Sequence, residues 1–242
     1  MARTAAPQPP YRLADHVRAC HVDGQVILLD LHHDRYLGVA GPQASAAAHW
    51  VADWPTADLQ AGEAAASSAV ESWLSKLQEA GLLVKTPPTP RQPDPLEDAL
   101  ETLATSDLQQ WRGVQWRRMT AICCATFVAS RWLKRRSLAG IAEALRSMRH
   151  GRESMGDEPT EALRCASSWY LRMRPFAISS QDQCLHDSLT LLHFLATERL
   201  YPRWVIGVRT RPFAAHSWVQ AQHLVLNDLH ENVRAYTPIL VV

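Results

Sequence analysis

A run of five prolines in ten residues, from Thr86 to Pro95, divides this chain into two parts. Proline fixes its φ angle and has no backbone N–H, so a segment this rich in proline forms neither a helix nor a paired strand. At 242 residues, the chain is long enough for two small domains that each bury a core. We therefore expect an N-terminal domain over residues 1–85, a semi-rigid linker over residues 86–95 and a C-terminal domain over residues 96–242.

The composition excludes several classes of protein. Hydrophobic residues make up 47% of the chain and charged residues 20%, as in ordinary folded proteins. A formal net charge of +1 gives no overall field to attract nucleic acid or anionic lipid, and no apolar run reaches the ~18 residues of a membrane span. The five cysteines lack zinc-type spacing, and the N-terminus lacks the apolar stretch of a signal peptide. We expect a cytoplasmic protein with no metal, no other cofactor and no membrane contact.

The N-terminal part has the pattern of a three-stranded meander followed by short helices. Three apolar-rich runs, Val17–His21, Gln25–Leu31 and Tyr36–Val39, are separated by Asp-Gly and His-His-Asp-Arg, which are turn sequences. Gly41 followed by proline favours the start of a helix. A capping box at Ser-Ala-Val-Glu favours a later helix, which Gly81 ends before a return strand. Strands and then three short helices in about 80 residues predict a winged-helix-like domain.

Winged-helix-like domains have two common uses, which are reading DNA with a helix and offering a sheet edge to an extended peptide. The helix expected to read DNA carries Lys76 as its only basic residue. Binding to a phosphate backbone needs many more cations than one. The sequence therefore favours peptide binding over nucleic-acid binding.

The C-terminal part begins with a helical pattern and ends with strands. Acidic residues at Glu97, Asp98 and Glu101 favour a helix N-terminus, and the apolar run Thr120–Ala129 predicts a buried helix with Cys123-Cys124 in its core. Strand patterns dominate from residue 203 onward, so this domain is expected to be α+β. A basic cluster indicates either a solvated helix end or, less favoured, an acidic docking site. Its members are Arg131, Lys134, Arg135 and Arg136.

The last third of the chain contains the residue types of a cysteine nucleophile system, in a consistent order. Ser180 and Gln183 form a capping box that places Cys184 in the first turn of an apolar helix, where the positive end of the helix dipole favours the thiolate. His216 begins an alternating strand, and Asp228 follows on the next strand. Each residue alone is more often structural, but the ordered set indicates that Cys184 attacks, His216 transfers the proton and Asp228 orients the imidazole.

The geometry of this site depends on how the last strands pair. A three-residue loop, Ala221-Gln222-His223, would place His216 directly opposite Asp228 on one face of the sheet. A shift of one residue would turn the carboxylate to the other face. We expect the backbone N–H of Cys184 to stabilise the oxyanion, assisted by the side-chain amide of Gln181 or Gln183.

The same residues resemble the B proteins of lasso-peptide biosynthesis, whose leader-peptidase domain is a transglutaminase-like (papain-like) cysteine peptidase. The resemblance is carried by Cys184-Leu-His-Asp-Ser-Leu-Thr-Leu-Leu, by Trp204-Val-Ile-Gly-Val-Arg-Thr-Arg-Pro-Phe-Ala-Ala-His216-Ser-Trp-Val, by Val225-Leu-Asn-Asp228 and by Tyr236-Thr-Pro-Ile. It implies that Cys184, His216 and Asp228 cut a ribosomally made precursor between its leader and core. An ATP-using cyclase similar to asparagine synthetase would then close the ring.

The resemblance also implies that the N-terminal domain captures the leader peptide as an added strand. We expect Arg35–Val39 to receive this strand and the later helix to form the other wall of a groove. The residues expected to contact the leader are Arg35, Tyr36, Leu37, Val39, Trp73, Leu77 and Gln78. Two alternatives remain open: an enzyme that transfers the acyl group to an amine, as a transglutaminase does, and a non-catalytic peptide-binding scaffold.

Overall fold

The structure is a computed structural model that describes residues 9–55, 68–85, 96–103, 115–150, 160–177 and 184–242. The chain divides into two compact units, Met1–Pro93 and Asp94–Val242, so the boundary falls inside the proline-rich segment. Residues 86–95 themselves lie outside the described ranges. Each unit is mixed in its secondary structure, and the fold of the chain as a whole is α+β.

The N-terminal unit contains the expected three-stranded meander. Strands β2 (Val17–Val22), β3 (Gln25–Asp30) and β4 (Arg35–Val39) form an antiparallel sheet in the order β2-β3-β4. Asp23 and Gly24 have φ angles of +47° and +76°, which suit a tight two-residue turn between Val22 and Gln25. The sequence His-His-Asp between β3 and β4 is a turn, as predicted.

Two helices follow the meander in the described part of this unit: α1 (Gly41–Ala47), with proline in its first turn, and α2 (Ser68–Glu79). Gly81 ends the second helix at φ +73°, and the next backbone N–H donates to the carbonyl of Leu77, as in a Schellman cap. The chain returns as β5 (Leu83–Val84), which pairs with β1 (Arg12–Leu13). Any third helix lies outside the described residues.

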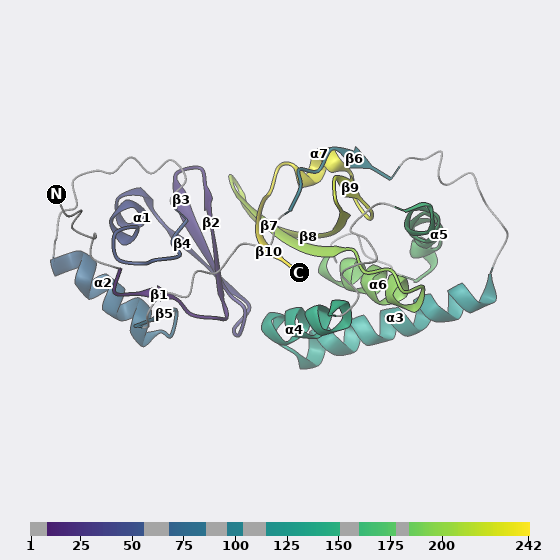
Figure 1. The fold of residues 1–242 in the computed structure, drawn as a ribbon, viewed down its shortest axis with the longest axis horizontal. Coiled ribbons are helices and arrows are strands. Elements are labelled where there is room, and N and C mark those ends of the chain that lie inside the picture. The colour runs from purple at the N-terminus through teal and green to yellow at the C-terminus, as the bar shows by residue number, and fades with distance from the viewer. Residues whose placement is uncertain (1–8, 56–67, 86–95, 104–114, 151–159, 178–183) are drawn as a thin grey trace, which may run out of the picture. The chain divides into compact units, whose positions relative to one another are not determined.

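The C-terminal unit has a five-stranded sheet in the order β10-β7-β8-β9-β6 (Figure 1). Its strands are β6 (Glu101–Thr102), β7 (Arg203–Thr210), β8 (Phe213–Ala221), β9 (Leu224–Val225) and β10 (Thr237–Val241). The prediction of a helix start around Glu101 was wrong. This segment instead pairs in parallel with β9, because the backbone N–H groups of residues 100 and 101 donate to the carbonyl of His223.

The described part of the same unit also contains helices. They are α3 (Trp116–Arg135), α4 (Leu138–Arg149), α5 (Glu161–Ala177), α6 (Cys184–Thr197) and α7 (His230–Val233). Of these helices, α6 packs most extensively against this sheet. Helix α6 lies between the sheet and α3 (Figure 1), and eight of its fourteen residues are buried. This helix is therefore surrounded by protein, as its apolar sequence predicted.

Helix α3 is less buried than its sequence indicated. Ile122, Ala125 and Ala129 face the core, whereas Cys123 and Cys124 are exposed, so the prediction that this cysteine pair fills the core was wrong. The apolar run is continuous, but among the described segments no helix or strand packs against the face that carries Cys123 and Cys124. The basic cluster at its end is exposed, where cations complement the helix dipole. Among the described helices, none is both long enough and apolar enough to cross a bilayer.

Candidate active site

Cys184 is the first residue of α6, and its thiol is partly buried. The backbone N–H groups of Leu185 and Ser217 both donate to its sulfur. These two donors belong to the helix start and to β8, so the sulfur lies where the helix meets the sheet. Residues 180–183, including the predicted cap and the amides of Gln181 and Gln183, lie outside the described ranges.

The structure brings the three predicted residues together. The Cys184 thiol is hydrogen-bonded to the imidazole of His216. Nε2 of His216 lies 2.5 Å from Oδ2 of Asp228, which leaves Nδ1 to face the sulfur. The same carboxylate accepts bonds from the backbone N–H of Leu229 and from Nδ2 of Asn232. Thiol, imidazole and carboxylate thus form one hydrogen-bonded chain.

The strand register that was predicted for this site was wrong. Strand β8 pairs with β9 through a two-residue turn, Gln222-His223, with Gln222 at φ +47°, so Ala221 faces Leu224. Continued at this register, the ladder would place Asp228 opposite Ser217. The pairing instead stops after Leu226, whose N–H donates to the carbonyl of Val219, and the chain bends. This bend, rather than a regular ladder, carries the carboxylate back to His216.

The three groups shift one another's pKa values. Burial alone would raise the pKa of the Cys184 thiol, but the bond to His216, its charge and the two backbone donors together lower it. Burial would lower the pKa of His216, yet its bonds to Asp228 and Cys184 raise it to about 9. Burial opposes ionisation of Asp228 too, and its bond to His216 nevertheless keeps its pKa below the ordinary value. The pair therefore favours thiolate and imidazolium at pH values above the pKa of Cys184 and below that of His216.

Aromatic rings enclose the imidazole. The ring of Trp218 stacks near that of His216, with centroids 6.0 Å apart, and the ring of Tyr236 lies 5.2 Å away. Trp218 and His216 are two residues apart on β8 and therefore belong to one face of the strand. Tyr236 reaches the ring from the segment before β10, which strand alternation alone does not reveal. These rings limit the access of water to the imidazole.

Gly207 lies opposite His216 on β7, and there is no room for a side chain at this position. A Cβ atom there would lie 2.7 Å from the Trp218 ring and 3.0 Å from Cβ of Tyr236. We expect Gly207→Ala to destabilise the C-terminal unit by about 1–3 kcal/mol and to slow any reaction that uses His216. Denaturant unfolding checks the first effect. Gly140→Ala in α4, where an added Cβ has ordinary contacts, is the control and is expected not to destabilise the fold.

The residues expected to contact a leader peptide lie in one unit but differ in burial. Strand β4 is an edge of its sheet, and Leu37 is 42% exposed on it. Val39 and Leu77 are 2% and 5% exposed and belong to the core, so they support the edge and are not available for contact. Trp73 packs edge-on against Trp54, while Arg35 and Gln78 are exposed.

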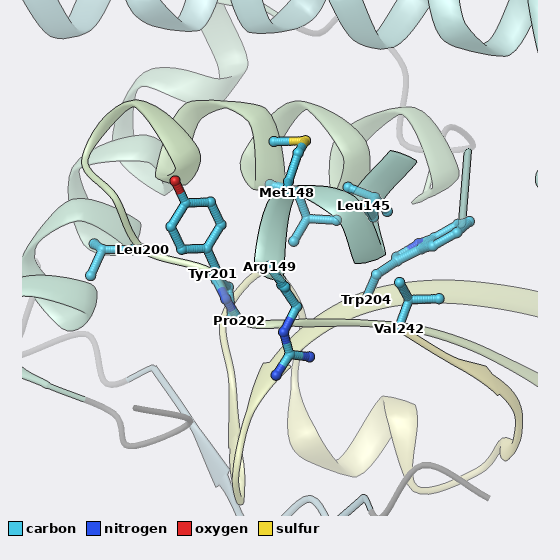
Figure 2. Close-up of a pocket in the computed structure, with 9 residues that line it drawn as sticks. Leu145, Met148, Arg149, Leu200, Tyr201, Pro202, Trp204 and Val242 are labelled. Carbon is cyan, nitrogen blue, oxygen red and sulfur yellow. The ribbon is translucent and has the colours of Figure 1, made fainter. Parts of the chain in front are cut away.

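A shallow pocket of the C-terminal unit lies apart from this site. It lies between α4, α6 and the segment before β7, and none of Cys184, His216 and Asp228 lines it (Figure 2). Its walls are mainly apolar, with Arg149 and Tyr201 as the polar exceptions. Across the described ranges, no group of three or more His, Cys, Asp or Glu side chains could hold a metal ion.

Comparison with known proteins gives a match for the region that contains this site. Residues 123–241 match the family model of the transglutaminase-like superfamily, and this range includes Cys184, His216 and Asp228. The C-terminal unit therefore has a transglutaminase-like core. A more particular relative is the microcin J25-processing protein McjB of Escherichia coli, which is 42% identical over 48 residues.

That alignment covers 20% of this chain and 23% of the relative, so the homology is distant and partial. The match supports the resemblance that the sequence motifs indicated. The search among solved structures gave no match.

Proposed function

We propose that this chain is a cysteine peptidase that removes the leader from a ribosomally synthesised lasso-peptide precursor. The observation that carries the proposal is the hydrogen-bonded chain from Cys184 through His216 to Asp228, within a transglutaminase-like core. The name of the partial relative, a microcin-processing protein, supports peptide processing as the activity. By the same resemblance, a cyclase similar to asparagine synthetase is the proposed partner that takes the released core.

The reaction follows from the protonation states of the three groups. The Cys184 thiolate attacks the peptide carbonyl and forms a carbon–sulfur bond, and the backbone N–H of Cys184 is the proposed donor to the developing oxyanion. The imidazolium of His216 then gives its proton to the departing amine as the C–N bond breaks. Water, deprotonated by His216, hydrolyses the thioester and restores the thiolate. Asp228 holds the ring in position and supports its charge throughout.

Two other functions use the same residues differently. An acyl-transferring enzyme would form the same thioester and pass the acyl group to an amine, so its product would join two substrates. A peptide-binding scaffold would bind the leader without cutting it. Mass spectrometry of the products separates the three: hydrolysis gives two fragments, transfer gives one larger product, and a scaffold gives neither. The lowered pKa of the Cys184 thiol and the intact set of hydrogen bonds favour catalysis over the scaffold.

For the N-terminal unit, we propose a winged-helix-like domain that receives the leader along β4. In a two-residue turn with two positive φ angles, the flanking residues Val22 and Gln25 form backbone hydrogen bonds with each other. Along an antiparallel strand, every second residue directs its backbone N–H and C=O to the same neighbour, so those of Ile27 also point to β2. Gly38 faces Ile27 on β4. Its backbone groups therefore point away from β3, toward the side where an added strand would pair.

Replacing Gly38 with proline tests this docking mode. Proline removes the N–H that faces the edge, and an edge strand tolerates it. We expect Gly38→Pro to raise KM for a precursor about tenfold and to leave kcat unchanged, because the peptidase site is untouched. Gly38→Ala is the matched control, since its Cβ would lie 3.6 Å from Ile27 and it keeps the N–H. Equal KM values for both variants would rule out pairing at this residue.

A further inference from the structure

Beside the proposed catalytic residues lies a buried carboxylate that the reaction does not use. Asp187 belongs to the first turn of α6, three residues after Cys184, and is 7% exposed. The hydroxyl of Tyr170 donates to its Oδ1 at 2.8 Å, and Nη1 of Arg174 donates to its Oδ2 at 3.2 Å. Both partners belong to α5, so the carboxylate joins two helices.

A third donor comes from the bend that carries Asp228. Nδ2 of Asn227 donates to Oδ2 of Asp187 at 2.9 Å and to Oγ of Ser188 at 3.2 Å. Its Oδ1 accepts the backbone N–H of Val219 at 2.8 Å. Because the ladder between β8 and β9 ends at this point, the side chain of Asn227 takes the place that a strand carbonyl would occupy. Arg174 also donates to the backbone carbonyl of Asn227, at 3.3 Å.

We propose that Asp187 and Asn227 are positioning residues, whose buried bridge fixes the distance between the helix of Cys184 and the bend of Asp228. This inference rests on the proposed function, since it concerns the same site. Neither residue contacts the reacting atoms. One follows the nucleophile by a single helical turn, and the other immediately precedes the carboxylate that bonds to His216.

The physical reason for the bridge is that both partners are buried, so their donors and acceptors must be satisfied within the protein. Asn227 is 8% exposed, and Val219 fixes the direction of its amide, so its N–H groups must point at α6. Asp187 is buried too, and a buried carboxylate is stable only when donors surround it. If Asn227 is lost, Val219 lacks an acceptor and the bend loses its hold on α6. The carboxylate of Asp228 then drifts from the imidazole.

The test is the pH dependence of alkylation at Cys184, which needs no peptide substrate. Iodoacetamide is the probe, and mass spectrometry of the Cys184 peptide separates this thiol from the other four. The key variant is Asn227→Ala in the full chain. It adds and removes no charge, so a change in thiol reactivity must come from geometry. As Asp228 moves away from His216, the pKa of the imidazole falls. The thiolate then has less imidazolium beside it, so the pKa of Cys184 rises. The midpoint of alkylation is expected to rise by about one pH unit, roughly a tenfold loss of thiolate below it.

A pair of exchanged residues provides the rescue. Asn227→Asp alone sets two carboxylates against each other and should raise the midpoint as well. Combined with Asp187→Asn, it restores a donor facing an acceptor while Val219 and Tyr170 keep their partners. Arg174 loses its acceptor at position 187 but keeps the backbone carbonyl at position 227, so the midpoint should return toward that of the wild type. This pair also serves if Asn227→Ala does not fold. Thr190→Val, which removes a buried hydroxyl bond elsewhere in α6, is the control for stability alone.

The outcomes separate this inference from the proposed function. A lower unfolding temperature in Asn227→Ala with an unchanged midpoint, as expected for Thr190→Val, would show a structural role only and would overturn the positioning role. Failure of the exchanged pair to restore the midpoint would do the same. A wild-type Cys184 that alkylates like a free thiol would instead count against the proposed peptidase.

Discussion

Replacing Cys184 with alanine is expected to abolish cleavage of a precursor peptide while leaving its binding unchanged. The thiolate forms the bond to the carbonyl, and no other described cysteine lies beside His216, so the rate should fall by more than about 10⁴-fold. The leader contacts proposed here belong to the other unit, so affinity should not change. A suitable substrate is a synthetic precursor from a short open reading frame next to the gene, with cleavage followed by mass spectrometry and binding by calorimetry.

The matched control is Cys165→Ala, which removes an exposed thiol from α5 of the same unit and should cleave normally. Normal cleavage by Cys184→Ala would show that Cys184 is not the nucleophile. Loss of both binding and cleavage would instead point to a folding defect, which thermal unfolding would reveal.

The second large effect is expected for Asp228→Asn. An amide cannot support the imidazolium and it favours the wrong tautomer, so kcat should fall by roughly 10³–10⁴-fold. The pH profile should change as well. In the wild type, cleavage is lost as pH rises through about 9, because His216 then gives up the proton that the leaving amine needs. Without the carboxylate, the pKa of His216 falls, and this alkaline limb should move to lower pH.

Measuring kcat and kcat/KM from pH 5 to 10 checks both parts of this prediction. Glu231→Gln is the matched control, because it removes an exposed negative charge three residues away from Asp228. It should keep the wild-type profile. An alkaline limb that stays near pH 9 in Asp228→Asn would show that the carboxylate does not set the protonation of His216.

The sequence predicted those features that depend only on interactions between residues close together in the chain. The turn at Asp23-Gly24, the proline start of α1 and the Gly81 cap depend on the conformational limits of single residues, and the structure shows each of them. The apolar sequence of α6 also agrees with its burial. Predictions failed where a distant segment decides the secondary structure. Glu101, for example, pairs with a strand more than a hundred residues later in the chain.

The candidate site shows the same division. The order Cys184, His216 and Asp228, and the helix and strand that carry the first two, can be read from residue types and periodicity. How Asp228 reaches the imidazole could not be read in this way, because the two-residue turn sets a register that would have turned it away. In the bend that corrects this, Asn227 bonds to Val219 on β8 and to Asp187 on α6, which lies 40 residues earlier in the chain. The sequence by itself determined which residues can react, but the distances between the reactive groups come from packing among segments that meet only after folding.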